Sequence, residues 1–277
     1  MEKTIQTYLK GDEEDQTLCH LVVGERGSGK TTFLMRQLRW ALDTIPNLKV
    51  LFVCPTFRYE ATGKYNWLTQ ERYARRVTVF LKYKSSLCKT ICARNPKKKG
   101  ASRLWLILED CGSVGQEFLN CPHARDLWGV ARHLQCNITV LFHSLRGGKM
   151  LSPYIRANLN VITVFSVNSL ALLKNIHEEI LSLVDGWENF RDFKNFFLEL
   201  TTSKMENGNF TRSHDAITID LSTRQVDANT KNFMFGQKPD GLKKQNARRK
   251  RRDPTSEDEG DAQRKSQKVL CEESGED

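Results

Sequence analysis

The chain has 277 residues, of which 39 % are apolar, and its formal net charge of +10 arises from 43 Lys and Arg against 33 Asp and Glu. No apolar run approaches the ~20 residues that a helix needs to cross a bilayer, and the start is too polar for a secretory signal peptide, so we expect a soluble intracellular protein with no membrane partner. The positive charge favours an anionic partner larger than a nucleotide, the alternative being a basic surface without one.

The eight cysteines are spread along the chain, mostly beside apolar stretches, and none forms a C-x-x-C pair. We therefore expect reduced, buried thiols rather than disulfides or a zinc site. The first segment, residues 1–16, is predicted to be a polar lead-in that contains an acidic cluster at residues 12–15. The folded domain is predicted to follow it, over residues 17–232.

A phosphate-binding motif follows the first apolar run, residues 18–23. The letters GERGSGKTT fit the pattern G-x-x-x-x-G-K-[ST], in which glycines let main-chain N–H groups converge on a phosphate and a helix adds its positive N-terminus. Lys30 is predicted to reach the β- and γ-phosphates of ATP, and the Thr31 hydroxyl to bind Mg²⁺. The predicted nucleotide-binding residues are Gly24, Glu25, Arg26, Gly27, Ser28, Gly29, Lys30, Thr31 and Thr32.

The next segments alternate between helical and strand patterns. A helix over residues 31–42 is followed by a short apolar run, residues 49–54, which is typical of a buried parallel strand. Residues 57–76 place aromatic side chains among arginines, which predicts either a base-stacking surface or, as we favour, a helix that packs its aromatic face. Residues 77–93 are predicted to be partly helical, and the basic loop 94–100 either contacts phosphates or is a solvated turn.

A second nucleotide motif is indicated where the apolar run 104–108 ends in Glu109 and Asp110. In such a pair, one carboxylate holds Mg²⁺ and its neighbour polarises the attacking water. The usual order is Asp then Glu, and here it is reversed. We prefer Glu109 as the metal ligand and Asp110 as the partner of the water, and the opposite assignment stays open.

The second half of the chain continues the alternation. We expect a helix at 118–134, a strand at 137–142, a strand at 160–165 and a helix at 169–184, with a terminal hairpin formed by 196–201 and 216–221. His143 and Ser144 follow the strand 137–142, where a polar side chain can sense the γ-phosphate. Five buried runs separated by helical segments predict an α/β fold with a central parallel sheet flanked by helices.

Hydrophobic periodicity stops after about residue 232, so we expect residues 233–277 to be a disordered, charged tail. Residues 238–277 carry eleven Lys and Arg against ten Asp and Glu, so almost all of the excess positive charge lies in residues 1–237. The basic residues 243–244 and 248–252 predict a nuclear import signal or a nucleic-acid-binding arm, the alternative being a solvated tail without an address.

A resemblance to a known family rests on four stretches that follow one another in this order: GERGSGKTT, LWLILEDCG, Arg132-His133 before NITVLFHS, and LSPYIRANLNVITVF. Over residues 18–185 the chain resembles the viral genome-packaging ATPases of the FtsK–HerA superfamily, the group that includes the poxvirus packaging ATPase. The resemblance implies a RecA-like (ASCE) P-loop NTPase core, assembled as a homo-oligomeric ring that pumps double-stranded DNA with ATP and Mg²⁺. The implied catalytic residues are Lys30 and Thr31, Glu109 and Asp110, Ser144 or His143, and Arg156 or Arg132 as an arginine acting on a neighbouring subunit.

The leading hypothesis is therefore an ATPase that packages a viral genome and works with capsid or other virion proteins in the host nucleus. Association with the virion is the alternative location. A nucleoside or nucleotide kinase is the first alternative, because arginines of the loop 145–158 could close over a small phosphate acceptor. A nucleotide-gated scaffold that binds DNA and capsid proteins is the second alternative, because the order of Glu109 and Asp110 is the reverse of the usual Asp then Glu. The effect of duplex DNA on the rate of ATP hydrolysis distinguishes the three hypotheses.

Overall fold

The computed structural model describes residues 2–11, 16–95, 102–109, 118, 121–143, 153–167, 169–181, 188–202, 204–206, 209–211, 213–223, 225–228 and 231–234. All of them belong to one structural unit, Met1–Pro239. The first two positions of the predicted tail, Phe233 and Met234, belong to the last strand of the sheet, so the predicted boundary at residue 232 is two residues too early. The rest of the tail lies outside the described residues, and its disorder stays a prediction.

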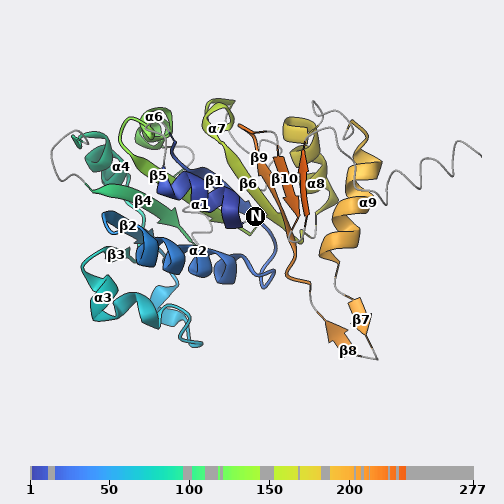
Figure 1. Ribbon diagram of the computed structural model, residues 1–277, viewed down its shortest axis with the longest axis horizontal. Helices are drawn as coiled ribbons and strands as arrows, with labels where there is room; N and C mark the ends of the chain where they lie inside the picture. Colours follow the sequence, from blue (N-terminus) through green and yellow to red (C-terminus); the bar gives the residue numbers. More distant parts are fainter. Residues whose placement is uncertain are drawn as a thin grey trace, which may run out of the picture. The chain divides into compact units, whose positions relative to one another are not determined.

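A nine-stranded sheet forms the centre of this unit, in the order β11-β10-β9-β6-β1-β5-β4-β2-β3 (Figure 1). The six strands from β6 to β3 are parallel, whereas β9, β10 and β11 are antiparallel to their neighbours. The strands are β1 Cys19–Val23, β2 Leu48–Val53, β3 Val77–Phe80, β4 Arg103–Leu108, β5 Cys136–Phe142, β6 Val161–Phe165, β9 Ala216–Asp220, β10 Gln225–Ala228 and β11 Lys231–Met234. A separate hairpin pairs β7, Lys204–Glu206, with β8, Asn209–Thr211.

Helices cover both faces of the sheet, because the central strands are apolar on both sides. On one face pack α1 (Glu2–Lys10), α2 (Lys30–Thr44), η2 (Asn66–Thr69) and α3 (Glu71–Ala74). The other face is covered by α4 (Ser85–Cys92), α6 (Pro122–Val130), α7 (Pro153–Asn158), α8 (Leu170–Ile176) and α9 (Phe190–Thr201). These layers confirm the predicted α/β fold with a central, mostly parallel sheet flanked by helices. No helix among the described residues is both long and apolar enough to span a membrane.

The strand register brings the carboxyl ends of the central strands to one edge. Val23 of β1 pairs with Phe142 of β5, and Val53 of β2 pairs with Leu108 of β4. Side chains that follow these strands therefore meet at the same edge of the sheet, where open parallel sheets bind their ligands.

The N-terminal segment differs from its prediction as a polar lead-in. It begins with α1, in which Ile5, Tyr8 and Leu9 are buried, and the Tyr8 hydroxyl donates a hydrogen bond to Asp220 Oδ1 at 3.0 Å. Spacings of three and four residues place these side chains on one helix face. The polar composition of the segment hid this apolar stripe.

The predicted terminal hairpin is also wrong. Residues 196–201 belong to α9, which is capped by the Asn189 side chain and buries Phe193 and Phe197, four residues apart, in the core. β9 instead pairs with β6 and β10. The apolar run at 196–201 is typical of a strand, but the four-residue spacing of Phe193 and Phe197 favours the helix that the structure shows.

Residues 77–93, predicted to be partly helical, contain the parallel edge strand β3 and the helix α4. The helix predicted at 118–134 is described over Pro122–Val130 as α6. The described part of the helix predicted at 169–184 consists of α8 and a π-helical turn, His177–Leu181, labelled η3, and residues 182–184 lie outside the described residues. The five predicted buried strands are all present and mutually parallel.

The six cysteines in the described part of the chain are free thiols, and all but Cys92 are buried. Burial raises the pKa of the Cys19 and Cys88 thiols to about 12. These thiols are therefore protonated at neutral pH and pack as small apolar groups.

Candidate nucleotide-binding site

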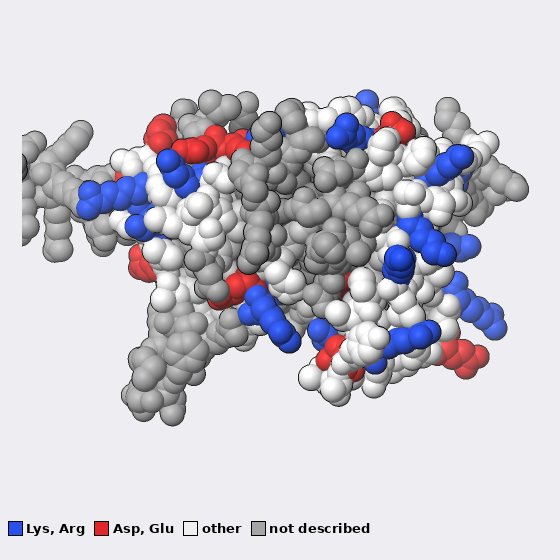
Figure 2. All heavy atoms as spheres, turned by 180° about the vertical axis from the view of Figure 1, so that it is seen from behind, with Lys and Arg blue, Asp and Glu red and all other residues white. Residues whose placement is uncertain are grey.

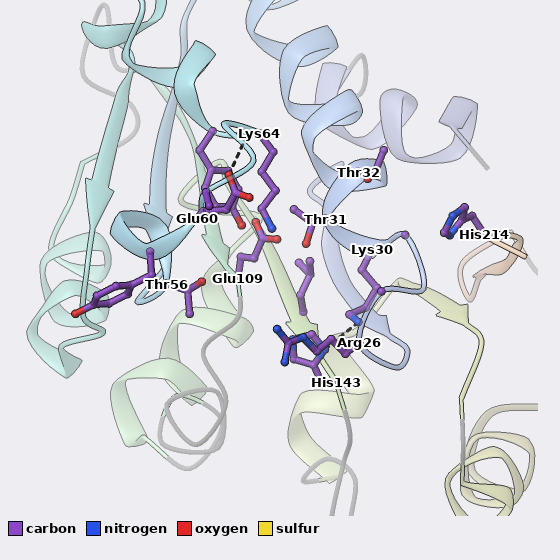
Figure 3. Close-up of a pocket in the computed structure, with 16 residues that line it drawn as sticks. Arg26, Lys30, Thr31, Thr32, Thr56, Glu60, Lys64, Glu109, His143 and His214 are labelled. Atoms are coloured by element: carbon purple, nitrogen blue, oxygen red, sulfur yellow. Dashed lines mark hydrogen bonds between the residues drawn. The ribbon is translucent and has the colours of Figure 1, made fainter. Parts of the chain in front are cut away.

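A cavity of about 780 Å³ opens at the carboxyl edge of the sheet (Figure 3). One wall is the motif between β1 and α2, and the opposite wall is the segment between β2 and η2. The lining residues are Arg26, Gly27, Gly29, Lys30, Thr31, Thr32, Thr56, Tyr59, Glu60, Ala61, Lys64, Tyr65, Glu109, Leu141, His143 and His214.

Two glycines shape the motif wall. Gly29, directly before α2, has φ 104°, a conformation that favours glycine. Gly24 is needed for a different reason, because a Cβ at this position would lie 2.6 Å from Phe165 Cβ and 2.8 Å from Ser28 Oγ. The loop therefore lies directly against the end of β6.

Main-chain hydrogen bonds fix the start of the loop to two neighbouring strands. The Gly24 N–H donates to the Phe142 carbonyl at 3.2 Å, and the Glu25 N–H donates to the Ser166 carbonyl at 2.8 Å. The Ser166 hydroxyl in turn donates to Glu25 Oε1 at 2.8 Å. The motif is thus held by the ends of β5 and β6 as well as by β1.

Lys30 is buried, with 4 % of its surface exposed. Its Nζ donates to the Gly24 carbonyl at 2.6 Å and to the Glu25 carbonyl at 2.7 Å. It also donates to His143 Nδ1 at 3.1 Å (Figure 3). An ammonium group can only donate, so His143 Nδ1 is the acceptor in this hydrogen bond. The ammonium is therefore positioned inside the loop, next to the tip of β5.

Glu109 follows β4 directly, and its N–H donates to the Val53 carbonyl at 2.9 Å. The side chain is 1 % exposed and lines the same cavity as Thr31. Burial and then the negative charge of Glu109 raise the pKa of Tyr65 above its usual value. Glu109 thus lies between the aromatic wall and the motif.

The described residues fit a magnesium nucleotide. Lys30 supplies a cation, the buried Ser28 hydroxyl makes no hydrogen bond within the described part of the chain, and the hydroxyl of Thr31 and the carboxylate of Glu109 are hard oxygen ligands facing one cavity. Asp110 and Ser144, the other two predicted catalytic residues of this edge, lie outside the described residues. The division of roles between Glu109 and Asp110 therefore stays open.

The sequence matches the family described as "Poxvirus A32 protein" over residues 13–180, which is more than half of the chain. The chain belongs to the Poxvirus A32 protein family. The matched range contains the whole motif wall, Glu109, His143 and both candidate arginines. No curated protein matches the chain.

Solved structures share the fold of this Poxvirus A32 family member. The genome packaging NTPase B204 of Sulfolobus turreted icosahedral virus 2, in complex with AMP, matches with a TM-score of 0.52 at 12 % identity, over 78 % of this chain and 97 % of that one. B204 of Sulfolobus Turreted Icosahedral Virus, a DNA-packaging ATPase, matches with a TM-score of 0.51 at 13 % identity, over 76 % and 95 %. The cytoplasmic domain of the Type VII secretion ATPase EccC of Thermomonospora curvata matches with a TM-score of 0.50 at 11 % identity, over 80 % and 26 %.

The two candidate arginines of this A32 family member lie away from the cavity. Arg156, on α7, pairs with Glu179 of η3, with 2.8 Å between Arg156 Nη1 and Glu179 Oε2. Arg132 lies exposed in the turn after α6. Neither lines the pocket of its own subunit. A position outside the cavity of its own subunit is what we expect of an arginine that acts on a neighbouring subunit. Which of Arg156 and Arg132 has this role stays a prediction.

Sequence reasoning missed most of the opposite wall, formed by Thr56, Tyr59, Glu60, Ala61, Lys64 and Tyr65, and also His214. The expected packing of aromatic side chains holds for Tyr65 and Tyr73, which are buried, and the Tyr65 ring stacks on Phe57 with the centroids 5.3 Å apart. Tyr59 is 84 % exposed and belongs to the cavity instead. The basic loop that precedes β4 lies mostly outside the described residues.

Proposed function

We propose that this chain is the ATPase of a viral genome-packaging machine, in which ATP hydrolysis drives DNA into a capsid. One observation carries this function. In this member of the Poxvirus A32 family, the same cavity is lined by the P-loop with its buried Lys30 and by the buried carboxylate of Glu109, which follows β4. Family membership and the RecA-like core support an ATPase of this kind.

Each residue has a defined task in this proposal. Lys30 and the main-chain N–H groups of the loop bind the β- and γ-phosphates, and Thr31 with Glu109 or Asp110 would hold Mg²⁺. When bound, Mg²⁺ neutralises charge that develops on the phosphate oxygens. His143, fixed by its hydrogen bond with Lys30, is placed at the strand tip where it can respond to the terminal phosphate.

We propose double-stranded DNA as the polymer that is moved and a homo-oligomeric ring as the assembly. The support for DNA as the partner is the net positive charge of residues 1–237 as a whole, rather than a single patch. Figure 2 shows Lys and Arg side chains on the described part of one face, spread among acidic and neutral ones. Capsid or other virion proteins would be the further partners of the ring.

Measurement of the ATPase rate with and without duplex DNA, at two salt concentrations, tests the function. We expect DNA to accelerate hydrolysis, and the acceleration to fall at the higher salt concentration because phosphate contacts release counterions. A kinase would ignore DNA and phosphorylate a nucleoside or nucleotide acceptor. A scaffold would bind ATP and DNA without turnover. Either result would reject the packaging ATPase.

The arginine that acts between subunits is tested by Arg156→Ala. This variant is expected to bind ATP normally but to lose hydrolysis in the assembled ring, because the positive charge that stabilises the γ-phosphoryl group during its transfer to water is missing. Arg132→Ala is the matched comparison. If Arg156→Ala hydrolyses ATP normally and Arg132→Ala does not, Arg132 is the acting residue.

We propose the host nucleus as the site of action, with the basic residues 243–252 as the import signal. Deletion of these residues is expected to leave the ATPase rate unchanged and to move the protein to the cytoplasm. Continued nuclear accumulation of the deletion variant would reject the import role.

A further inference from the structure

Lys64 lies on the wall that faces the P-loop. The segment that carries it is fixed by its own hydrogen bonds, since the Glu60 carboxylate accepts from the Thr62 N–H and the Lys64 N–H, each at 2.9 Å. Gly63, directly before Lys64, has φ 73° and makes the turn possible. The main chain at Lys64 is thus held in place by a small closed loop.

The side chain of Lys64 is directed into the cavity. Figure 3 shows it extending toward the side where Glu109 and Thr31 lie. Its Nζ is 4.8 Å from the centroid of the Tyr65 ring, a cation–π contact that stabilises this direction. The Tyr65 ring is itself fixed by stacking on Phe57.

Charge explains why a cation is placed there. The polyphosphate of a nucleotide would share the cavity with the buried carboxylate of Glu109, and the P-loop wall offers the ammonium of Lys30. In the proposed function, Lys30 contacts the terminal phosphate from the P-loop side. A second cation on the opposite wall would contact the same phosphate from the other side and offset its repulsion by Glu109.

We propose that Lys64 binds the γ-phosphate of ATP from the wall opposite the P-loop, and so makes the site distinguish ATP from ADP. This inference rests on the proposed function of the cavity. ADP lacks the group that Lys64 contacts, so the lysine contributes to ATP affinity and not to ADP affinity.

Titration calorimetry with ATPγS and with ADP, each in the presence of Mg²⁺, tests the role of Lys64 in the full chain. Lys64→Met keeps the length of the side chain and removes its charge. We expect it to weaken ATPγS binding roughly 10- to 100-fold, the range for loss of one charge-assisted hydrogen bond, and to leave ADP binding unchanged. Unchanged ADP affinity also shows that the variant is folded.

Two further variants complete the experiment. Lys64→Arg keeps the positive charge and is expected to retain most of the preference for ATPγS. Lys49→Met removes an exposed lysine of β2 that does not line the cavity and is expected to behave like the wild type. Equal losses for both ligands in Lys64→Met, or no loss for either, would overturn the role of Lys64 while leaving the proposed function intact. Failure of the wild type to bind either ligand would overturn the proposed function itself.

Discussion

The two walls of the cavity are built in different ways. The P-loop wall comes from consecutive residues, and its main chain is held by β5 and β6 through Gly24 and Glu25. The opposite wall combines the segment after β2 with Glu109 after β4, so it exists only once the sheet has formed. One wall is therefore formed by consecutive residues, whereas the other depends on the tertiary arrangement of β2 and β4. In the proposed function, the first wall binds the phosphates and the second contributes Glu109 and Lys64.

Removal of the Lys30 ammonium should lower ATP turnover more than any other change, because this cation belongs to the P-loop wall that binds the phosphates in the proposed function. Lys30→Ala is expected to lower ATP turnover roughly 100-fold or more, the order of effect seen when a preorganised electrostatic donor is removed from an active site. Steady-state ATPase measurements check this. Lys49→Ala, outside the cavity, serves as the control, and full turnover in Lys30→Ala would refute the P-loop assignment.

The close approach of Gly24 to β6 predicts the next largest effect. Gly24→Ala would place a Cβ 2.6 Å from Phe165 Cβ, so the loop must move. We expect a loss of about 1–3 kcal/mol in the free energy of unfolding, as for overpacking, together with weaker ATP binding.

Denaturant unfolding and nucleotide titration measure the two consequences of Gly24→Ala. Gly129→Ala is a suitable control, because its new Cβ would meet the hydroxyl end of the half-exposed Tyr154 side chain, which can turn away. Normal stability and normal ATP affinity in Gly24→Ala would show that the loop does not depend on its contact with β6.

A buried histidine beneath the P-loop predicts a smaller effect that depends on pH. His20 of β1 bonds to Thr163 Oγ1 of β6 at 2.9 Å, and burial lowers its pKa from 6.5 to about 3. Between these values the unfolded chain takes up a proton that the folded chain excludes. The free energy of unfolding should therefore fall as the pH falls below 6.5, by about 1.4 kcal/mol per unit for this group.

Unfolding curves at about pH 7.5, 6 and 5, which lie on either side of the ordinary histidine pKa, measure how much His20 contributes to the pH dependence of the free energy of unfolding. His20→Gln should reduce the dependence on pH, whereas His133→Gln, which alters an exposed histidine, should not. An unchanged slope in His20→Gln would mean that His20 does not couple the stability of β1 to pH.

The sequence predicted what is local. Apolar runs identified all five central strands, and the glycine spacing identified the P-loop, since both patterns depend on neighbouring residues. It also identified Glu109, because a carboxylate after a buried strand must lie at the edge of the sheet. The errors arose where packing decided the structure, as in α1, whose apolar residues stand in a polar segment, and in α9, whose run of aromatic residues also fits a strand.

The rest of the site could not be read from the sequence. Lys64 and Tyr65 belong to no motif and reach the cavity through a turn that Gly63 and the Glu60 side chain create. His214 comes close to the P-loop from the segment before β9, where a Cβ on Gly29 would lie 3.3 Å from His214 Cβ. Such contacts depend on the order of strands in the sheet, which local patterns do not specify.

Calorimetric titration of the wild-type chain with ATP and Mg²⁺ at millimolar concentrations, with and without duplex DNA, tests the central claim most directly. The account predicts saturable binding by the wild type that Lys30→Ala loses. A well-folded wild-type chain that takes up no nucleotide under either condition would contradict it.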